Sequence, residues 1–154
     1  MIEIVKKFLE EEKFKYEVDD DNQIITLFLS GNTGSWMGLA NVNQENNQLI
    51  FYSVIPSRVP KESRAPVMEF ITRANYNLLI GNFEMDMEDG EVRFKTSIDV
   101  SGDNLSIALV KNMIYFNFIA IDRHLESLMK VMYGNMSAKK AFEEAVEKMK
   151  HIEA

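Results

Sequence analysis

The densest group of reactive side chains lies in the stretch NFEMDMEDGEVRFKTSI, residues 82–98. Five acidic residues fall within the eight positions 84–91 of this stretch. Clustered carboxylates can bind a hard metal ion such as Ca²⁺, or can act as a paired general acid and general base. The same residues alternate between apolar and charged side chains, which is typical of a half-exposed β-hairpin. The spacing of the residues decides among these interpretations.

An Asp-Gly pair at residues 89–90 predicts a hairpin with a two-residue turn, and this turn predicts how the two strands align. The alignment pairs Asp86 with Arg93, Glu84 with Lys95, Met87 with Val92, Met85 with Phe94 and Phe83 with Thr96. Both charged pairs are complementary and lie on one side of the hairpin, whereas the apolar pairs lie on the other. We therefore expect a structural hairpin with one solvated side.

This pairing argues against a metal site and against a catalytic site. A calcium loop of the EF-hand type needs a glycine at its sixth position and a glutamate at its twelfth. Counted from Asp86, these positions hold Glu91 and Ser97. Carboxylates on a solvated face also keep similar pKa values, which does not suit paired acid–base catalysis. We expect no metal ion and no cofactor.

No other motif of the sequence predicts catalysis. The chain has no cysteine, and it lacks the glycine-rich phosphate loops, the G-x-S-x-G nucleophile motif and the H-E-x-x-H zinc motif. Its two histidines, His124 and His151, are expected on the surface. We therefore expect a protein that is not an enzyme.

Polar side chains crowd together in TRANYN, residues 72–77, at the end of an amphipathic pattern. One interpretation is a helix C-terminus, where Arg73 favours the helix dipole and Asn77 caps the last turn. The other is a polar recognition patch beside a sheet, with Arg73 and Asn75 as contact residues. The alternative function that such a patch allows is a small-molecule sensor or an uncharacterised enzyme, with a pocket near Arg73, Asn75 and Trp36.

Hydrophobic periodicity predicts the elements that position these residues. Helical patterns cover residues 2–12, 61–78, a long segment from the SGDN cap at 101–104 to Tyr133, and 138–151, while strand patterns cover 23–30, 35–43, 48–55, 82–88 and 91–99. A sixth, short strand near residue 16 is an open alternative. Short turns between neighbouring strands favour antiparallel pairing. We predict an α+β fold of order αβββαββαα, with a mostly antiparallel five-stranded sheet flanked by helices, as a single domain over residues 1–154.

Composition and charge exclude some classes of partner. The chain has a formal net charge of −7, so its surface repels nucleic acids. Residues 104–121 are apolar enough to suggest a membrane span, but Lys111, Asn112 and Asn117 favour a helix buried in protein. Three consecutive glutamates lie where a signal peptide would need an apolar run. We therefore expect a cytoplasmic protein without a nucleic-acid or membrane partner.

The strand QLIFYSVI, residues 48–55, is apolar on both of its sides. Leu49, Phe51 and Ile55 lie on one side, and Ile50, Tyr52 and Val54 lie on the other. The long helix and the N-terminal helix can cover one face of the sheet, and helix 61–78 is expected to cover the other. The surplus apolar surface predicts a homodimer, although cover by the C-terminal helix is an alternative. The expected partner or dimer surface comprises Ile50, Tyr52, Val54, Met68, Arg73 and Asn75.

Three motifs of the chain resemble a known family: TRANY at 72–76, IGNFE-D--DGE-R-KTSID at 80–99, and DRHL at 122–125. They are similar to the YbjN-type family of bacterial sensory-transduction regulators, in the branch found in cyanobacteria. The resemblance implies the fold of the type III secretion chaperones, which are small acidic homodimers that bind unfolded polypeptide. It further implies a non-enzymatic, chaperone-like protein-binding or regulatory role in bacterial signalling or stress response, with an unidentified protein or peptide partner.

Overall fold

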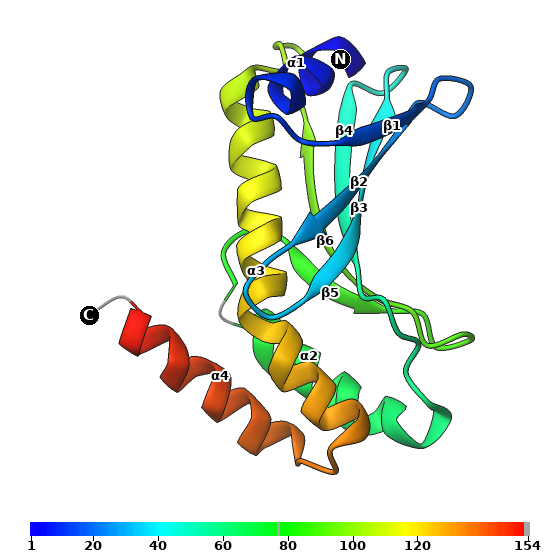
Figure 1. Cartoon of the computed structure of the whole chain (residues 1–154). Helices are drawn as coiled ribbons and strands as arrows, with labels where there is room; N and C mark the ends of the chain where they lie inside the picture. Colours follow the sequence, from blue (N-terminus) through cyan, green and yellow to red (C-terminus); the bar gives the residue numbers. More distant parts are fainter. Residues whose placement is uncertain (77, 153–154) are drawn as a thin grey trace.

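The computed structural model describes the backbone of residues 1–76 and 78–152 and the side chains of residues 1–76 and 78–148 (Figure 1). The predicted α+β fold is confirmed. The elements are α1 (Ile2–Glu11), β1 (Tyr16–Asp19), β2 (Ile24–Ser30), β3 (Ser35–Asn43), β4 (Gln48–Val54), the short 3-10 helix η1 (Lys61–Ser63), α2 (Arg64–Tyr76), β5 (Asn82–Met85), β6 (Val92–Asp99), α3 (Ile107–Tyr133) and α4 (Ala138–Ile152). Asn77, the expected capping residue, lies outside the described residues.

A single antiparallel sheet of six strands forms the framework, in the order β1-β2-β3-β4-β6-β5. The prediction of five strands is therefore wrong by one. The additional strand is β1, the open alternative near residue 16, which pairs with the first half of β2. A four-residue strand shows too little alternation to be recognised alone, and its pairing with β2 stabilises it.

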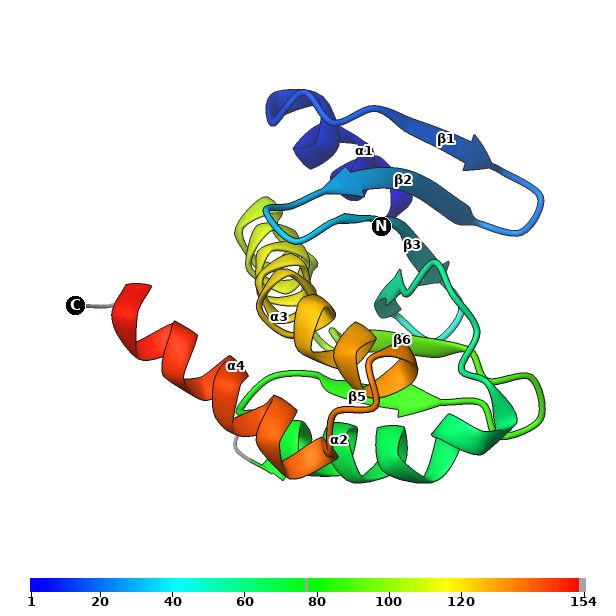
Figure 2. The same cartoon turned by 60° about the horizontal axis from the view of Figure 1, so that its bottom comes forward.

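The sheet curls around α3, which lies along the concave face (Figures 1 and 2). α1 packs on α3 near one end of the helix, and α4 packs on α3 and α2 near the other end. Side chains from the concave face form the core with α3, including Ile25, Leu27, Leu49, Phe51 and Phe94. In the part of the chain that the structure describes, no helix lies on the convex face, which we call the outer sheet face.

The position of α2 differs from the prediction that helix 61–78 covers the second face of the sheet. α2 lies beside the edge strand β5, where Asn75 bonds to the backbone of Phe83. From there Phe70 reaches His124 of α3, with the ring centroids 6.3 Å apart. The apolar stripe of α2 is buried against α3, β5 and α4. Because α4 also packs on helices, neither predicted intramolecular cover of the outer sheet face exists.

The β5–β6 hairpin has the predicted faces but a different alignment. Six residues, 86–91, connect the strands in place of two, and the Asp86 N–H bonds to the Glu91 carbonyl at 2.8 Å within this connection. This shifts the pairing by two residues, which changes the partners but leaves each strand side chain on its predicted side. The observed pairs are Asn82 with Lys95, Phe83 with Phe94, Glu84 with Arg93 and Met85 with Val92.

A contact with a distant segment sets the length of this turn. Gly90 has a φ of +80°, and a Cβ at this position would lie 2.4 Å from the carbonyl oxygen of Val59. The Val59 N–H also bonds to the Gly90 carbonyl at 2.8 Å. The turn therefore fits against the segment before α2, and glycine at position 90 allows this approach.

The long helix α3 begins later than the SGDN cap predicts. Ser106 is its N-cap, and the Ser106 Oγ accepts the Leu109 N–H at 3.2 Å. The helix ends at Gly134 as predicted, where the Gly134 N–H bonds to the Lys130 carbonyl. Among the described residues, no helix combines the length and the apolar character needed to cross a membrane.

Candidate functional site

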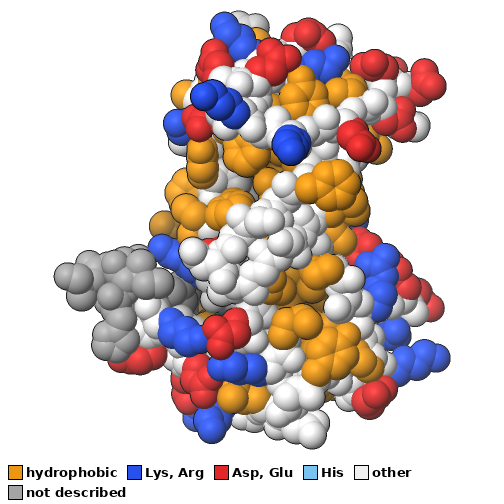
Figure 3. All heavy atoms as spheres, in the orientation of Figure 1, with side chains coloured by type: hydrophobic (Ala, Val, Ile, Leu, Met, Phe, Trp, Pro, Cys, Tyr) orange, Lys and Arg blue, Asp and Glu red, His pale blue; other side chains and the backbone are white. Residues whose placement is uncertain are grey.

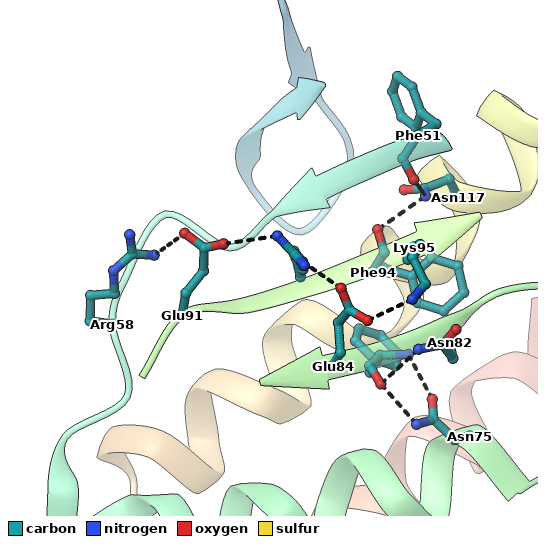
Figure 4. A network of polar contacts seen from close by, with 11 residues as sticks. Phe51, Arg58, Asn75, Asn82, Glu84, Glu91, Phe94, Lys95 and Asn117 are labelled. Atoms are coloured by element: carbon teal, nitrogen blue, oxygen red, sulfur yellow. Dashed lines mark hydrogen bonds and ion pairs between the residues drawn. The ribbon is translucent and has the colours of Figure 1, made fainter. Parts of the chain in front are cut away.

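The charged residues of the β5–β6 hairpin form a chain of ion pairs on the outer sheet face (Figure 4). Glu84 lies between Arg93 and Lys95, with its Oε2 2.9 Å from the Lys95 Nζ. Glu91 links Arg93 to Arg58, whose Nη1 is 2.7 Å from the Glu91 Oε2. Partial burial acts to raise the pKa of Glu84, but hydrogen bonds from Lys95 and Arg93 outweigh burial and the pKa is lowered. Glu84 is therefore ionised and neutralised by its neighbours.

Only part of the predicted charge pairing is observed. Glu84 does pair with cations of β6, whereas the prediction that Asp86 pairs with Arg93 is wrong. Asp86 lies beyond the end of β5, and its Oδ1 accepts the Glu88 N–H at 2.8 Å. Within the side chains described, no three His, Asp or Glu residues are grouped so that they could hold a metal ion. The charges of this hairpin hold its strands together.

Asn75 of the TRANY motif closes the outer edge of β5. Its Oδ1 accepts the Phe83 N–H at 2.7 Å, and its Nδ2 donates to the Phe83 carbonyl at 3.0 Å (Figure 4). One amide side chain thereby replaces the backbone of a neighbouring strand. Arg73 forms an ion pair with Glu69, one turn earlier in α2, at 2.7 Å. Asn75 therefore has a structural role, which its position in the sequence pattern does not reveal.

The DRHL motif lies in the second half of α3 and makes two structural contacts. Asp122 holds the loop between β2 and β3, because its Oδ1 accepts the Thr33 N–H at 2.9 Å. His124, predicted on the surface, is buried, with its Nδ1 2.8 Å from the Ala120 carbonyl oxygen. The prediction fails because His124 follows the buried Asn117 by two helical turns and shares its side of α3. The side chain of His151 lies outside the described residues.

The six residues predicted for a partner surface fall in different places. Ile50, Tyr52 and Val54 lie on the outer sheet face, where alternation along β4 places them. Met68 and Arg73 line a hollow on the outside of α2, and Asn75 is engaged at the edge of β5. The structure brings the first three together and separates them from the others.

The alternative pocket near Arg73, Asn75 and Trp36 is not assembled. Trp36 is buried in β3, where its Nε1 donates to the Ser53 Oγ at 3.0 Å and its ring packs on Phe118. Trp36 lines a hollow at the end of the sheet, whereas Arg73 lines the hollow on α2. The three residues therefore do not converge on one ligand.

The outer sheet face carries an apolar patch. Its members are Thr26, Phe28, Met37, Leu39, Ile50 and Tyr52. Phe28 is the most exposed of them, with 69% of its surface open to solvent. Figure 3 shows hydrophobic side chains exposed across the middle of the molecule, between two ends that are rich in charged side chains. A contiguous exposed patch of this kind indicates an interaction surface.

The second half of β2 is an open sheet edge. β1 is shorter than β2, and its pairing ends with Tyr16 opposite Leu27. Residues 28–30 pair with β3 on one side, and no described strand lies on their other side. We call these three residues the open edge.

The ladder between β2 and β3 shows which backbone groups the open edge exposes. The Val42 N–H bonds to the Gln23 carbonyl at 3.0 Å, and in an antiparallel pair such bonded residues recur at every second position. Leu29 therefore bonds to β3, whereas the N–H and C=O groups of Phe28 and Ser30 point away from β3, those of Phe28 toward the segment before β1 and those of Ser30 toward no described strand. The open edge thus presents donors and acceptors at the spacing of an extended chain.

A hollow of about 180 Å³ lies beside the open edge. It is lined by Phe14, Phe28, Leu29, Ser30, Ile114, Tyr115 and Phe118. Its walls are mainly aromatic and come from the segment after α1, from β2 and from α3. β1 determines where this edge opens, and the sequence pattern leaves the existence of a strand near residue 16 open. The sequence therefore does not predict this site.

Comparison with solved structures identifies proteins of similar fold. The crystal structure of YbjN from E. coli, described as "a putative transcription regulator", has a TM-score of 0.61 and 12% identity, over 88% of this chain and 91% of that chain. A chain of the HopA1–SchA chaperone–effector complex has a TM-score of 0.53 and 12% identity, over 79% of this chain and 88% of that chain. The predicted chaperone-like fold is thereby confirmed. Among curated proteins, none matches the chain.

A family profile shows the relationship in sequence. The profile of the YbjN family, described as "Putative bacterial sensory transduction regulator", matches residues 2–129. The matched range contains the TRANY motif, the β5–β6 hairpin and the DRHL motif. Membership of a cyanobacterial branch stays a prediction. The chain belongs to the YbjN family.

Proposed function

We propose that this protein is a non-enzymatic, chaperone-like module that binds an extended segment of another protein. The observation that carries the proposal is the open edge, together with the aromatic hollow beside it. The proposed setting is bacterial signalling or stress response in the cytoplasm. The description of the family and the chaperone–effector neighbour support a regulatory or protein-binding role.

Backbone geometry favours an extended polypeptide at the open edge. The outward N–H and C=O groups of Phe28 and Ser30 can pair with a strand that continues the line of β1. Such strand addition derives its affinity from backbone hydrogen bonds. The acidic net charge of −7 disfavours a nucleic-acid backbone at the same place.

Side-chain alternation favours a particular kind of segment. In an added strand, successive side chains point to opposite faces of the sheet. One side chain would enter the hollow at Tyr115 and Phe118, and the next would lie beside Phe28 on the outer sheet face. A segment with apolar residues at neighbouring positions would therefore bind best, because both of its faces meet apolar surface.

Crosslinking in the native cell tests this proposal. A photo-crosslinking amino acid at position 28 should capture the partner segment, and the matched control carries it at Met68, which is 43% exposed on α2. A synthetic peptide copied from the captured segment should slow amide hydrogen exchange at Phe28 and Ser30. Exchange at Leu29 should stay unchanged, because its N–H already bonds to β3.

A proline substitution isolates the contribution of the backbone. Phe28→Pro removes one outward donor without removing a donor from the ladder with β3. We expect it to fold and to bind the peptide about tenfold more weakly than the wild type, because a hydrogen bond and an aromatic contact are lost. Equal capture at positions 28 and 68, or a peptide that protects neither amide, would contradict the proposal.

We also propose that the protein is a homodimer in which a second copy packs on the apolar patch of the outer sheet face. The supporting observation is that no described helix covers this patch, although it includes Phe28 and Met37, which are 69% and 37% exposed. A two-fold contact through one self-complementary patch is the commonest arrangement of soluble oligomers.

A further inference from the structure

Another cavity lies between α3, α4 and the segment that joins α2 to β5. Its volume is about 430 Å³, and its walls include Leu79, Ile80, Phe116, Ile119, His124 and Phe142. We call it the helix groove. It shares no lining residue with the hollow beside the open edge, so the two sites are separate. Figure 2 shows how α4 crosses α2 and diverges from α3 toward its C-terminal end.

The rim of the helix groove is unusually apolar for a protein surface. Leu79 is 99% exposed, and Ile80, Phe116 and Ile119 are 44%, 49% and 40% exposed. All four residues come from the two sides of one opening. A concave site of this composition resembles small-molecule sites, which enclose roughly 300–1,000 Å³ and are lined mostly by apolar side chains.

His124 supplies one polar group within this apolar wall. It is 4% exposed, and its Nδ1 lies 2.8 Å from the Ala120 carbonyl oxygen. A carbonyl can only accept, so Nδ1 carries the proton and Nε2 is left as an acceptor. The rings of Phe70 and Phe83 pack edge-on against the imidazole and fix its orientation.

The second nitrogen of His124 has no partner in the described part of the chain. Its hydrogen bond to Ala120 uses Nδ1 alone. His124 lines the groove, and its Nε2 is not among the described buried polar atoms that are both unpaired and sealed from solvent. Burial lowers the pKa of His124, and the imidazole is therefore neutral at neutral pH. The wall thus presents an uncharged acceptor.

We propose that the helix groove binds a small, mostly apolar molecule that carries one O–H or N–H donor, which bonds to the Nε2 of His124. The apolar body would lie against Leu79, Phe116 and Ile119, whose exposed surface it would cover. The neutral Nε2 acceptor selects a ligand with a donor, and Arg123 also lines the groove beside His124. This binding site is independent of the proposed function, because it uses none of the residues of the open edge.

Indole and 1-methylindole form a matched pair of probes, since they share a ring system and differ in the N–H donor. Each is titrated into the full chain and followed by amide chemical shifts. We expect indole to bind with a Kd below about 1 mM, a modest affinity for its size. The shifts should centre on residues 78–80, 116–120 and 124. 1-Methylindole should bind about fivefold more weakly, as the loss of one hydrogen bond predicts.

Two variants distinguish the contribution of the His124 acceptor to binding from that of the apolar wall. His124→Phe keeps a ring but removes the acceptor, so it should bind indole and 1-methylindole with equal affinity. Ile119→Arg places a charge at the rim, where the native residue is already 40% exposed, and should weaken both probes at least about fivefold. Met68→Arg, a matched change on the outside of α2, should weaken neither. If His124→Phe does not fold, the Ile119→Arg and Met68→Arg pair still tests the site.

Several results would overturn this inference. These are the absence of saturable binding by indole, equal affinity of the wild type for the two probes, and shifts that centre on Tyr115 and Phe118. Weakening by Met68→Arg to the same degree as by Ile119→Arg would also overturn it. If indole bound only at protein concentrations at which the chain is a monomer, a second copy of the chain would fill the groove in the dimer. This result would also overturn the inference. None of these results affects crosslinking at position 28, so the two proposals fail separately.

Discussion

At the scale of single residues, Asn117 links α3 to the sheet. Its Nδ2 donates to the carbonyl oxygens of Phe51 and Phe94 at 3.0 and 3.1 Å, and so joins the helix to the neighbouring strands β4 and β6. In the sequence, Asn117 argues only against a membrane span. Its partners depend on how closely the curled sheet approaches α3, and a hydrophobic pattern does not encode that approach.

We expect Asn117→Leu to lower the free energy of unfolding by about 2 kcal/mol, because two buried carbonyl groups lose a donor. Leucine has a similar volume, so the change in packing is small. Asn112→Leu, at an exposed position of the same helix, is the control and should change stability by less than about 0.5 kcal/mol. Urea unfolding measures both variants. Equal losses in the two would contradict the role of the buried amide.

His124 should make the stability of the protein depend on pH. Burial lowers its pKa and outweighs the hydrogen bond to Ala120, which acts in the opposite direction. The unfolded chain therefore binds a proton more readily, and the stabilisation is present above a pH of about 6.5 and is lost as the pH falls further. We expect the free energy of unfolding to decrease between about pH 7 and pH 5, and His124→Phe to reduce that slope. A pKa of His124 that NMR finds at or above the usual value for histidine would refute this prediction.

At the scale of elements, the sequence predicts which segments form strands and helices better than where they lie. Alternation places Phe83 and Glu84 on the correct sides of β5, but the turn is longer than predicted because it fits against Val59. The apolar stripe of α2 is also correct, yet Asn75 holds the helix beside β5 and not across the sheet. In both cases the contact that fixes the position joins two separate segments of the chain, and a hydrophobic pattern within one segment does not predict such a contact.

Asn75→Ala should expose the edge of β5. The Phe83 N–H and C=O would lose their side-chain partners, and we expect a loss of about 1–2 kcal/mol in the free energy of unfolding. An open strand edge also promotes pairing between molecules, so the variant should aggregate faster on heating. Arg73→Ala, which removes only an exposed ion pair with Glu69, is the control. Light scattering during a thermal ramp compares them, and equal aggregation would exclude the edge-closing role.

At the scale of the whole molecule, α3 lies against the concave face of one sheet and α2 lies beside its edge, while α1 and α4 pack on these helices. The two apolar sides of strand 48–55 indicate that apolar surface lies on both faces of the sheet. They do not indicate which side a helix covers, because both sides have similar composition. The open edge is less predictable still, since it depends on the residue at which a weakly patterned β1 stops pairing.

The molecular mass of the protein in solution tests the homodimer prediction. Light scattering at micromolar concentration should give twice the chain mass of 17.8 kDa. Tyr52→Glu places a carboxylate within the outer apolar patch and should reduce the mass toward that of one chain. Tyr76→Glu, at a position that is 89% exposed on α2, should leave the dimer intact. A wild-type mass of one chain would exclude the dimer, and dissociation by Tyr76→Glu alone would move the interface to α2.

Asp122 holds the loop between β2 and β3 through two acceptors, since its Oδ1 bonds to the Thr33 N–H and its Oδ2 bonds to the Asn32 side chain, each at 2.9 Å. This loop directly follows the open edge, so Asp122 anchors one end of that edge to α3. The conformational entropy lost on binding would then fall on the incoming segment alone. Association would need no rearrangement of this protein, and differences in affinity among segments would appear mainly as differences in how slowly each one leaves.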